Sequence, residues 1–188
     1  MITPLSWLKD YVDIDITPQE LEEKLFSCGF EVEELSYLGE KISRVVVGEV
    51  KALTPHPDSD HMQICVVDCG EEYGTDIQIV TGASNVNVGD HVPAALPGAT
   101  VYARKKGDDS GAYDVMTIKK GKLRGVESDG MLCSGEELGI DDDWYDGAEV
   151  YGIMMLGEDA LPGMDVKEYL QLDDEVMDIS VTANLPHC

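Results

Sequence analysis

The sequence predicts an α+β fold that is mainly β, in which a small barrel of short strands is inserted into a split α+β domain. Three features predict it: a capped helix with a following strand in residues 1–40, a series of short strands in residues 41–150, and a second helix and strand in residues 151–188. The chain has 188 residues, of which 43% are hydrophobic and 27% charged, so it can bury a core in one domain or in two small ones.

The first segment carries the clearest helix signal. Thr17-Pro18-Gln19-Glu20 has the pattern of a capping box, with Thr as the N-cap, Pro at the first helical position and Glu at the third. Leu21, Leu25 and Cys28 then fall on one face, and Gly29 is placed to end the helix. A shorter helix is expected over Ser6–Tyr11, with Trp7, Leu8 and Tyr11 packing inward, and a strand over Phe30–Leu38.

Short β-branched runs separated by turn residues begin at Arg44. Such a series, with turn chemistry between the strands, predicts a small closed or nearly closed barrel. Loops are expected at Gly70–Thr75 and Lys106–Tyr113. The expected strands are Val45–Leu53, Met62–Asp68, Ile77–Thr81, Val92–Leu96, Val115–Lys120 and Gly130–Cys133.

The C-terminal part follows an acidic stretch over residues 141–147. A short helix is expected from Pro162 to Leu170, and the alternation of Met177, Ile179 and Val181 predicts a half-buried strand. Neither end of the chain can form a domain alone. We therefore expect residues 1–40 and 151–188 to pack together as one small domain, with residues 41–150 inserted as the barrel.

The net charge of −25 is the unusual feature of the composition. It argues against a general binder of polyanions, because affinity for phosphates comes from Lys and Arg. The charge is unevenly distributed, however: residues 104–124 hold seven basic and three acidic side chains, whereas residues 125–188 hold one basic and seventeen acidic ones. This local basic segment is either a solvated hairpin or a surface that faces phosphate.

Membrane and secretion signals are not found in the sequence. No apolar run approaches the ~20 residues that a membrane-spanning helix needs. The first residues lack a secretory signal, and the five cysteines contain no CxxC pair, which favours reduced thiols and a cytoplasmic location. The chain ends abruptly just after a strand pattern, so the boundary at Cys188 is not expected to be a natural end.

The densest polar cluster is His56-Pro57-Asp58-Ser59-Asp60-His61. Its spacing is similar to part of the metal-binding motif of metallo-β-lactamase-like hydrolases, but Asp58 stands where the central His belongs. Only His91 and His187 remain as further imidazole ligands. A turn between strands is the favoured interpretation, so neither a metal site nor a catalytic site is predicted.

The segment from Lys119 to Ser134 is the strongest candidate for binding. Lys120, Lys122 and Arg124 alternate, so they share one side of an extended chain, whereas Lys119 faces the other side. Ser128 and nearby backbone amides can contact phosphates or bases. A barrel with a basic loop is the plan of an oligonucleotide-binding (OB) barrel. Tyr102 and Tyr113 are the only nearby aromatic side chains that could stack on bases.

Several motifs, in this order along the whole chain, resemble the N-terminal region of the bacterial phenylalanyl-tRNA synthetase β subunit. They are Ser6-Trp7-Leu8-Lys9-Asp10-Tyr11-Val12-Asp13-Ile14, Val46-Val47-Gly48-Glu49-Val50, His56-Pro57 with Asp60, Ile79-Val80 with Gly82-Ala83 and Asn85-Val86, Leu123-Arg124-Gly125-Val126-Glu127-Ser128 with Gly130-Met131-Leu132-Cys133-Ser134, and Val181-Thr182-x-Asn184-x-Pro186-x-Cys188.

The resemblance implies an OB barrel of the tRNA-binding type and a role in tRNA binding during ATP-dependent phenylalanylation of tRNA. It implies no cofactor in this chain, since ATP and Mg²⁺ act on the separate α subunit, and partners that include tRNA, the α subunit and the rest of the β subunit in a heterotetramer. The residues expected to contact tRNA are Lys119, Lys120, Lys122, Arg124, Ser128, Asn85 and His61.

The chain departs from the family pattern at a few positions. His61, Gln63 and Val66 stand where basic residues are common, which weakens the electropositive face of the barrel. Leu185 and His187 replace Arg and Asp in the tail motif. Two alternatives therefore stay open: a structural or assembly module of the synthetase, and a stand-alone tRNA-binding protein.

Overall fold

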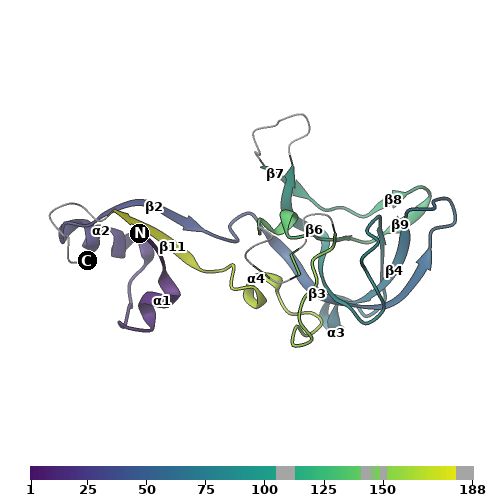
Figure 1. Cartoon of the computed structure of the whole chain (residues 1–188), viewed down its shortest axis with the longest axis horizontal. Coiled ribbons are helices and arrows are strands. Elements are labelled where there is room, and N and C mark those ends of the chain that lie inside the picture. The colour runs from purple at the N-terminus through teal and green to yellow at the C-terminus, as the bar shows by residue number, and fades with distance from the viewer. Residues whose placement is uncertain (105–112, 141–144, 146, 149–151, 181–188) are drawn as a thin grey trace. The chain divides into compact units, whose positions relative to one another are not determined.

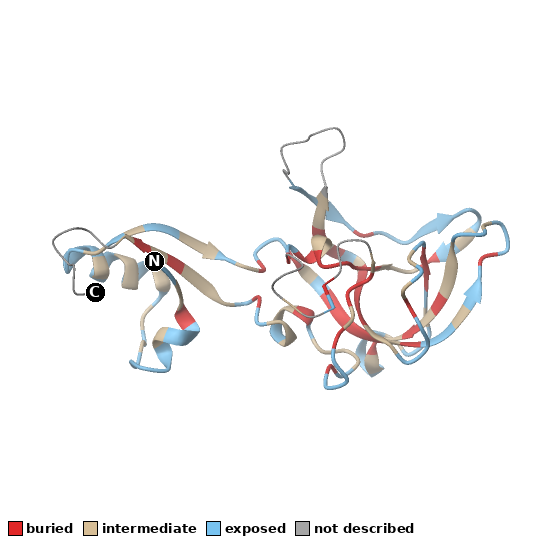
Figure 2. Cartoon of the chain, viewed as in Figure 1, coloured by how far each residue is buried: buried red, intermediate tan, exposed pale blue. Residues whose placement is uncertain are grey.

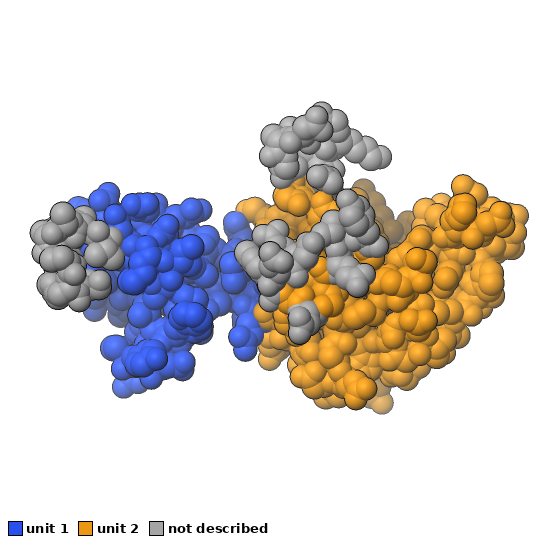
Figure 3. All heavy atoms as spheres, in the orientation of Figure 1, with its two compact units in different colours: residues 1–40, 171–188 blue, residues 41–170 orange. Residues whose placement is uncertain are grey.

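The computed structural model describes residues 1–104, 113–140, 145, 147–148 and 152–180. Two compact units make up the chain: residues 1–40 with 171–188 form unit 1, and residues 41–170 form unit 2 (Figure 3). Within the described residues, no helix is long and apolar enough to cross a membrane.

Unit 1 is built from both ends of the chain. Its antiparallel sheet has the order β1-β11-β2, with Ile2 opposite Asp178 and Met177 opposite Leu35 (Figure 1). The elements are β1 (Ile2–Pro4), α1 (Leu5–Lys9), α2 (Pro18–Ser27), β2 (Glu31–Tyr37) and β11 (Glu175–Ser180). Because β11 lies between β1 and β2, the last described strand completes a sheet that the first forty residues cannot form alone.

The predicted capping box at α2 is confirmed. Thr17 Oγ1 accepts a hydrogen bond from the Glu20 N–H at 3.3 Å, and the Glu20 carboxylate accepts one from the Thr17 N–H at 2.9 Å. These bonds lower the pKa of Glu20, the backbone hydrogen bond from Thr17 most of all. Gly29 follows the helix with φ 91°, a left-handed conformation that favours glycine.

The predicted inward faces of the two helices are only partly correct. Trp7 and Tyr11 are 65% and 87% exposed, so the prediction that they pack inward is wrong, and Cys28 is exposed as well. The five-residue helix α1 ends at Lys9 and turns only one narrow face to the sheet, which Leu5 and Leu8 occupy. The small core consists of Leu5, Met177 and Ile179, with Leu8, Leu21, Leu25, Phe30, Val32 and Leu35 packed against it.

Unit 2 is mainly β. Its central antiparallel sheet has the order β10-β6-β3-β4-β5, and β7 also pairs with β6. β8 and β9 pair with each other in a separate two-stranded ribbon. The strands are β3 (Ser43–Pro55), β4 (Gln63–Asp68), β5 (Ile77–Thr81), β6 (His91–Arg104), β7 (Tyr113–Thr117), β8 (Gly121–Leu123), β9 (Val126–Ser128) and β10 (Met131–Leu132). The helices are α3 (Gly70–Tyr73), a 3₁₀ turn (Glu136–Leu138) and α4 (Val166–Tyr169). The first expected loop therefore contains a short helix, and most of the second lies outside the described residues.

The core of unit 2 lies on the concave side of this curved sheet, where buried residues gather (Figure 2). Val46 and Val50 of β3, Val67 of β4 and Ile79 of β5 are almost fully buried there. Gly48 permits the close approach of β3 and β4, because a Cβ at this position would lie 2.4 Å from Val67 Cγ1. Packing this tight makes the sheet a firm scaffold for its loops.

The edge strand β5 is hydrogen-bonded to the end of β9 and to the residue that follows it. The Asp129 N–H donates to Gln78 O at 2.8 Å, and the Val80 N–H donates to Ser128 Oγ at 3.0 Å. The Gln78 side chain adds a bond to Glu127 O at 2.7 Å. The β8–β9 hairpin is therefore held at its base by β5.

The segment 152–170 belongs to unit 2, although the sequence pattern placed it with the chain ends. The Leu156 N–H donates to His91 O at 2.8 Å, and Val47 exchanges bonds with Gly163 and Met164, also at 2.8 Å. Backbone groups of β3 and β6 that the sheet leaves unpaired find partners in this segment. The units thus divide at residue 170, which differs from the predicted boundary at residue 150.

Candidate nucleic-acid interface

The β8–β9 hairpin and the two residues that precede it carry most of the predicted binding residues. Arg124 and Gly125 form its two-residue turn with φ 45° and 88°, as a type I′ turn requires of both central residues. In the register, Lys122 lies opposite Glu127 and Leu123 lies opposite Val126. The basic side chains therefore project from a tightly turned ribbon, and all of them are exposed.

Lys122 in the hairpin and Lys120 just before it each have an acidic partner on the opposite side of the ribbon. Lys122 Nζ lies 3.1 Å from Glu127 Oε1, and Lys120 Nζ lies 3.2 Å from Asp129 Oδ1. Both pairs are exposed, with lysine side chains 64% and 67% accessible, so each contributes little to stability. Lys119 is exposed and takes part in no ion pair with another described residue. The positive charge of the hairpin is thus locally offset but accessible.

The hairpin tip contacts the loop between β3 and β4. Arg124 Nη1 donates to Asp58 O at 3.1 Å, and a ring nitrogen of His56 lies 3.1 Å from Leu123 O. His56 is only 4% exposed, so its ring belongs to the packed part of this loop. Among the described residues, no group of His, Cys, Asp and Glu is arranged to hold a metal ion.

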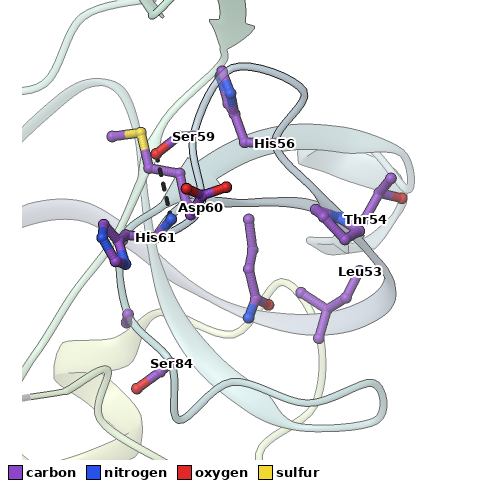
Figure 4. A pocket seen from close by; sticks show the side chains of 12 residues that line it. Leu53, Thr54, His56, Ser59, Asp60, His61 and Ser84 are labelled. Carbon is purple, nitrogen blue, oxygen red and sulfur yellow. Dashed lines mark hydrogen bonds between the residues drawn. The ribbon is translucent and has the colours of Figure 1, made fainter.

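An open groove of about 760 Å³ lies beside this loop (Figure 4). Ser59, Asp60 and His61 lie together on one side of it, while the ring of His56 points away from His61 and Ser84. His61 is exposed, and its backbone N–H donates to Ser59 Oγ at 3.4 Å. The groove is lined by residues 53–56, 59–63 and 82–84. Polar groups make up rather more of its lining than apolar ones, so the groove offers hydrogen-bond donors and acceptors to a ligand.

Ser128 and Asn85, both predicted to contact tRNA, have hydrogen-bond partners inside the protein. The Ser128 hydroxyl accepts from the Val80 N–H and donates to Gly130 O at 2.9 Å, and the residue is 4% exposed. The Asn85 side chain donates to Ile153 O at 2.8 Å and accepts from the Ile153 N–H at 3.1 Å. The burial of Ser128 and the internal bonds of both side chains weigh against direct contact with a ligand.

A basic residue that the sequence pattern did not single out lies near the hairpin base. Arg44 lines a pocket of about 380 Å³ together with Lys120 and Asp129. It is separated from Lys120 by seventy-five residues in sequence, and the pocket also includes Glu72 and Asp76. The pocket brings together segments that are remote in sequence, so no local signal could have identified Arg44.

The other residues singled out in the sequence are two tyrosines that could stack on bases and the remaining lysines of the basic segment. Tyr102 and Tyr113 contact each other edge to face, with ring centroids 6.1 Å apart. The Tyr113 hydroxyl also donates to Glu136 at 3.4 Å. Lys105 and Lys106, which complete the basic segment, lie outside the described residues.

Comparison with known proteins identifies the family. A family model described as "Putative tRNA binding domain" matches residues 45–164, which is more than half of the chain and includes the hairpin and the groove. A solved structure of Naegleria gruberi RNA ligase aligns at a TM-score of 0.42 with 14% identity over 76% of this chain and 37% of that one, which is too low to support a conclusion.

Relatives match across both units. The phenylalanine–tRNA ligase beta subunit of Clostridium acetobutylicum is 45% identical over all 188 residues, and that of Streptococcus pneumoniae is 44% identical over 184 residues, 98% of this chain. The chain spans about a fifth of the length of these relatives, 22% and 21% respectively. It therefore belongs to the tRNA-binding domain family and is homologous to the N-terminal region of phenylalanine–tRNA ligase beta subunits.

Proposed function

We propose that this chain is the N-terminal tRNA-binding module of a phenylalanine–tRNA ligase beta subunit and that it does not catalyse a reaction by itself. One observation carries the proposal: the family match over residues 45–164 encloses an exposed basic hairpin and an open polar groove that share a loop. The hairpin supplies cations for phosphates, and the groove supplies a surface beside them.

Lys119, Lys120, Lys122 and Arg124 are the proposed phosphate contacts. Recognition would depend on phosphate positions and shape, because lysine ammonium groups read charge rather than base identity. His61 would add a weak contact from the groove. We assign Ser128 and Asn85 an indirect role, in which they hold the backbone under the hairpin and beside the groove.

The distribution of charge in the chain makes tRNA binding weak and restricts the direction from which tRNA approaches. Glu127 and Asp129 compete with phosphates for Lys122 and Lys120, and the net charge of −25 repels a polyanion from the rest of the surface. The hairpin then sets the direction of approach. Strong binding would need further contacts from the longer protein to which this chain is homologous.

The parent enzyme supplies the remaining parts of the proposal. It would attach phenylalanine to tRNA with ATP and Mg²⁺ on a separate α subunit in a cytoplasmic heterotetramer, leaving this chain without a cofactor. The bonds between β5 and residues 127–129 further support a closed OB barrel inserted into a split domain.

A salt titration with tRNA tests this function. If three or four phosphates are neutralised, log K should fall against log[salt] with a slope of about −2 to −4 between about 50 and 200 mM salt. Polyglutamate as the titrant, which is a polyanion without nucleotides, controls for nonspecific association. No binding at low salt, or a slope near zero, would refute the proposal.

An assembly role is the second candidate, and a specific observation favours it. Among the aromatic side chains of unit 1, Trp7, Tyr11 and Phe26 are the most exposed, at 65%, 87% and 73%. Unit 1 also falls entirely outside the family match but inside the match to the beta subunits. The rest of the subunit would cover these side chains, whereas a stand-alone tRNA-binding protein would leave them exposed.

Replacing all three aromatic residues with Ser separates these roles. In this chain alone the substitutions remove no buried contact, so the unfolding temperature should change little. In the full-length subunit they should lower it clearly if later domains pack on this surface. An unchanged full-length protein would exclude the assembly role for these residues.

A further inference from the structure

The ring of His56 connects two elements that are remote in sequence. It lies in the loop that lines the groove, and it contacts the tip of the hairpin at Leu123 O. The residue is 4% exposed although Pro57 and Asp58 beside it are exposed. Neither the metal interpretation nor phosphate binding explains why an imidazole is packed here.

The hydrogen bonds determine which ring nitrogen carries the proton. The Asp58 backbone N–H lies 3.1 Å from His56 Nδ1, and a backbone N–H can only donate, so Nδ1 must be an unprotonated acceptor. Nε2 then carries the hydrogen and donates it to Leu123 O at 3.1 Å. His56 is therefore a neutral ring in the Nε2–H form.

Arg124 closes the connection from the other side. Its Nη1 donates to Asp58 O at 3.1 Å, so both backbone groups of Asp58 are engaged, one by His56 and one by Arg124. A backbone hydrogen bond closes the loop itself: the main-chain N–H of His56 donates to Met62 O at 3.0 Å. Loop and hairpin tip thus form one hydrogen-bonded unit, which we call the latch (His56, Asp58, Leu123 and Arg124).

We propose that His56 is a positioning residue for tRNA binding: as a neutral Nε2–H imidazole it fixes the hairpin tip to the groove loop. This inference rests on the proposed function. A two-stranded ribbon is mobile without support, and ordering it on binding would cost affinity. The latch orders the hairpin tip, which carries Lys122 and Arg124, against the groove loop before tRNA arrives.

Two substitutions separate the halves of the latch. His56→Asn keeps an acceptor near the place of Nδ1 but cannot reach Leu123, whereas His56→Gln places an amide donor near the position of Nε2. We expect His56→Asn to weaken tRNA binding about two- to tenfold, the effect of one hydrogen bond, and His56→Gln to retain most of the affinity. Amide exchange at Val126, opposite Leu123 in the hairpin, should accelerate only in His56→Asn.

A double-mutant cycle distinguishes positioning from a general loss of fold. Because the latch acts through the hairpin, Lys122→Ala should reduce affinity less in the His56→Asn background than in the wild type. Additive effects, or His56→Asn binding as tightly as the wild type, would overturn the proposal. Lys24→Ala in unit 1 serves as the control that should show no coupling.

NMR of the free chain tests the hydrogen bonding of the latch in the absence of RNA. Long-range ¹H–¹⁵N correlations of the His56 ring should show a protonated Nε2 and a bare Nδ1. The opposite tautomer, or a doubly protonated ring at neutral pH, would contradict it. If the wild type shows this tautomer but fails to bind tRNA, the proposed function fails and the positioning role falls with it, while the latch remains as a structural feature.

Discussion

Lys122 Nζ lies 3.1 Å from Glu127 Oε1, directly across the β8–β9 hairpin. The two residues are opposite each other in the register, so the pair follows from the strand pairing itself. The same ribbon places Lys120 against Asp129. The surface proposed to bind phosphate therefore contains its own competing carboxylates.

Removing one of these carboxylates should strengthen binding. Glu127→Gln frees the Lys122 ammonium and deletes a repulsive charge, so we expect tRNA affinity at about 50 mM salt to rise about 1.5- to 5-fold, in line with the modest strength of exposed ion pairs. Glu158→Gln, an exposed acid elsewhere in unit 2, is the matched control. Equal gains for both variants would indicate a net-charge effect alone.

Ser128→Ala should destabilise unit 2. The variant leaves the Val80 N–H and Gly130 O without their hydroxyl partner, and an unpaired buried group costs about 1–3 kcal/mol. Urea unfolding together with amide exchange at Val80 measures the loss. Ser84→Ala, an exposed serine in the groove, should change stability by less than about 0.5 kcal/mol. If Ser128→Ala weakened tRNA binding with stability unchanged, direct contact would be the better explanation.

Asn85 should act through the Ile153 backbone. Asn85→Ala removes both bonds to Ile153, so we expect a loss of about 1–3 kcal/mol and faster amide exchange at Ile153, with the salt slope of tRNA binding unchanged. Gly152→Ala should have a similar effect, since its Cβ would lie 2.6 Å from Asn85 Nδ2. Ser84→Ala, exposed and one residue away, is the control. A flattened slope in Asn85→Ala would restore it as a tRNA contact.

The buried cysteines should resist alkylation. Burial raises the pKa of Cys65 to about 11 and that of Cys69 to about 12, and it also raises the pKa of Cys133. At about pH 8 the reactive thiolate of Cys65 is then a fraction of about one in a thousand, and it grows tenfold for each unit of rising pH.

Mass spectrometry after iodoacetamide treatment checks this expectation. In a Cys188→Ser background, native chain should be modified at the exposed Cys28 and nowhere else, and urea should open the other three sites. Cys28→Ser should remain unmodified over the same interval. Rapid modification of Cys65 in the native chain would show that its surroundings are open.

Local signals predicted the elements well. The capping box at Thr17 and Glu20 depends on residues three apart, and the strand patterns around Val46, Ile64 and Ile79 reflect burial on a single sheet, so the sequence alone suffices for both. The turn at Arg124 and Gly125 was not predicted: Arg124 was expected to continue an extended run with Lys120 and Lys122, but its φ of 45° places it in the turn. The orientation of short helix α1 was not predictable, because its exposed aromatic residues look like core residues in sequence.

Partners that are remote in sequence could not be predicted. Segment 152–170 joins unit 2 through backbone bonds to β3 and β6, which leave no mark on side-chain patterning. For the same reason, the sequence could not show that Ser128 and Asn85 bond inward or that Arg44 lies near Lys120. The ion pairs of Lys120 and Lys122 were hidden because a linear charge count does not record strand register.

The most direct test compares two triple-lysine variants in the tRNA salt titration. Lys119→Ala/Lys120→Ala/Lys122→Ala removes the hairpin lysines, and Lys9→Ala/Lys24→Ala/Lys167→Ala removes the same charge elsewhere. If the hairpin binds phosphate, the first variant should reduce the magnitude of the slope of log K against log[salt] by about 2 to 3, and the second by less than about 0.5. Equal slopes for the two variants would contradict the central claim.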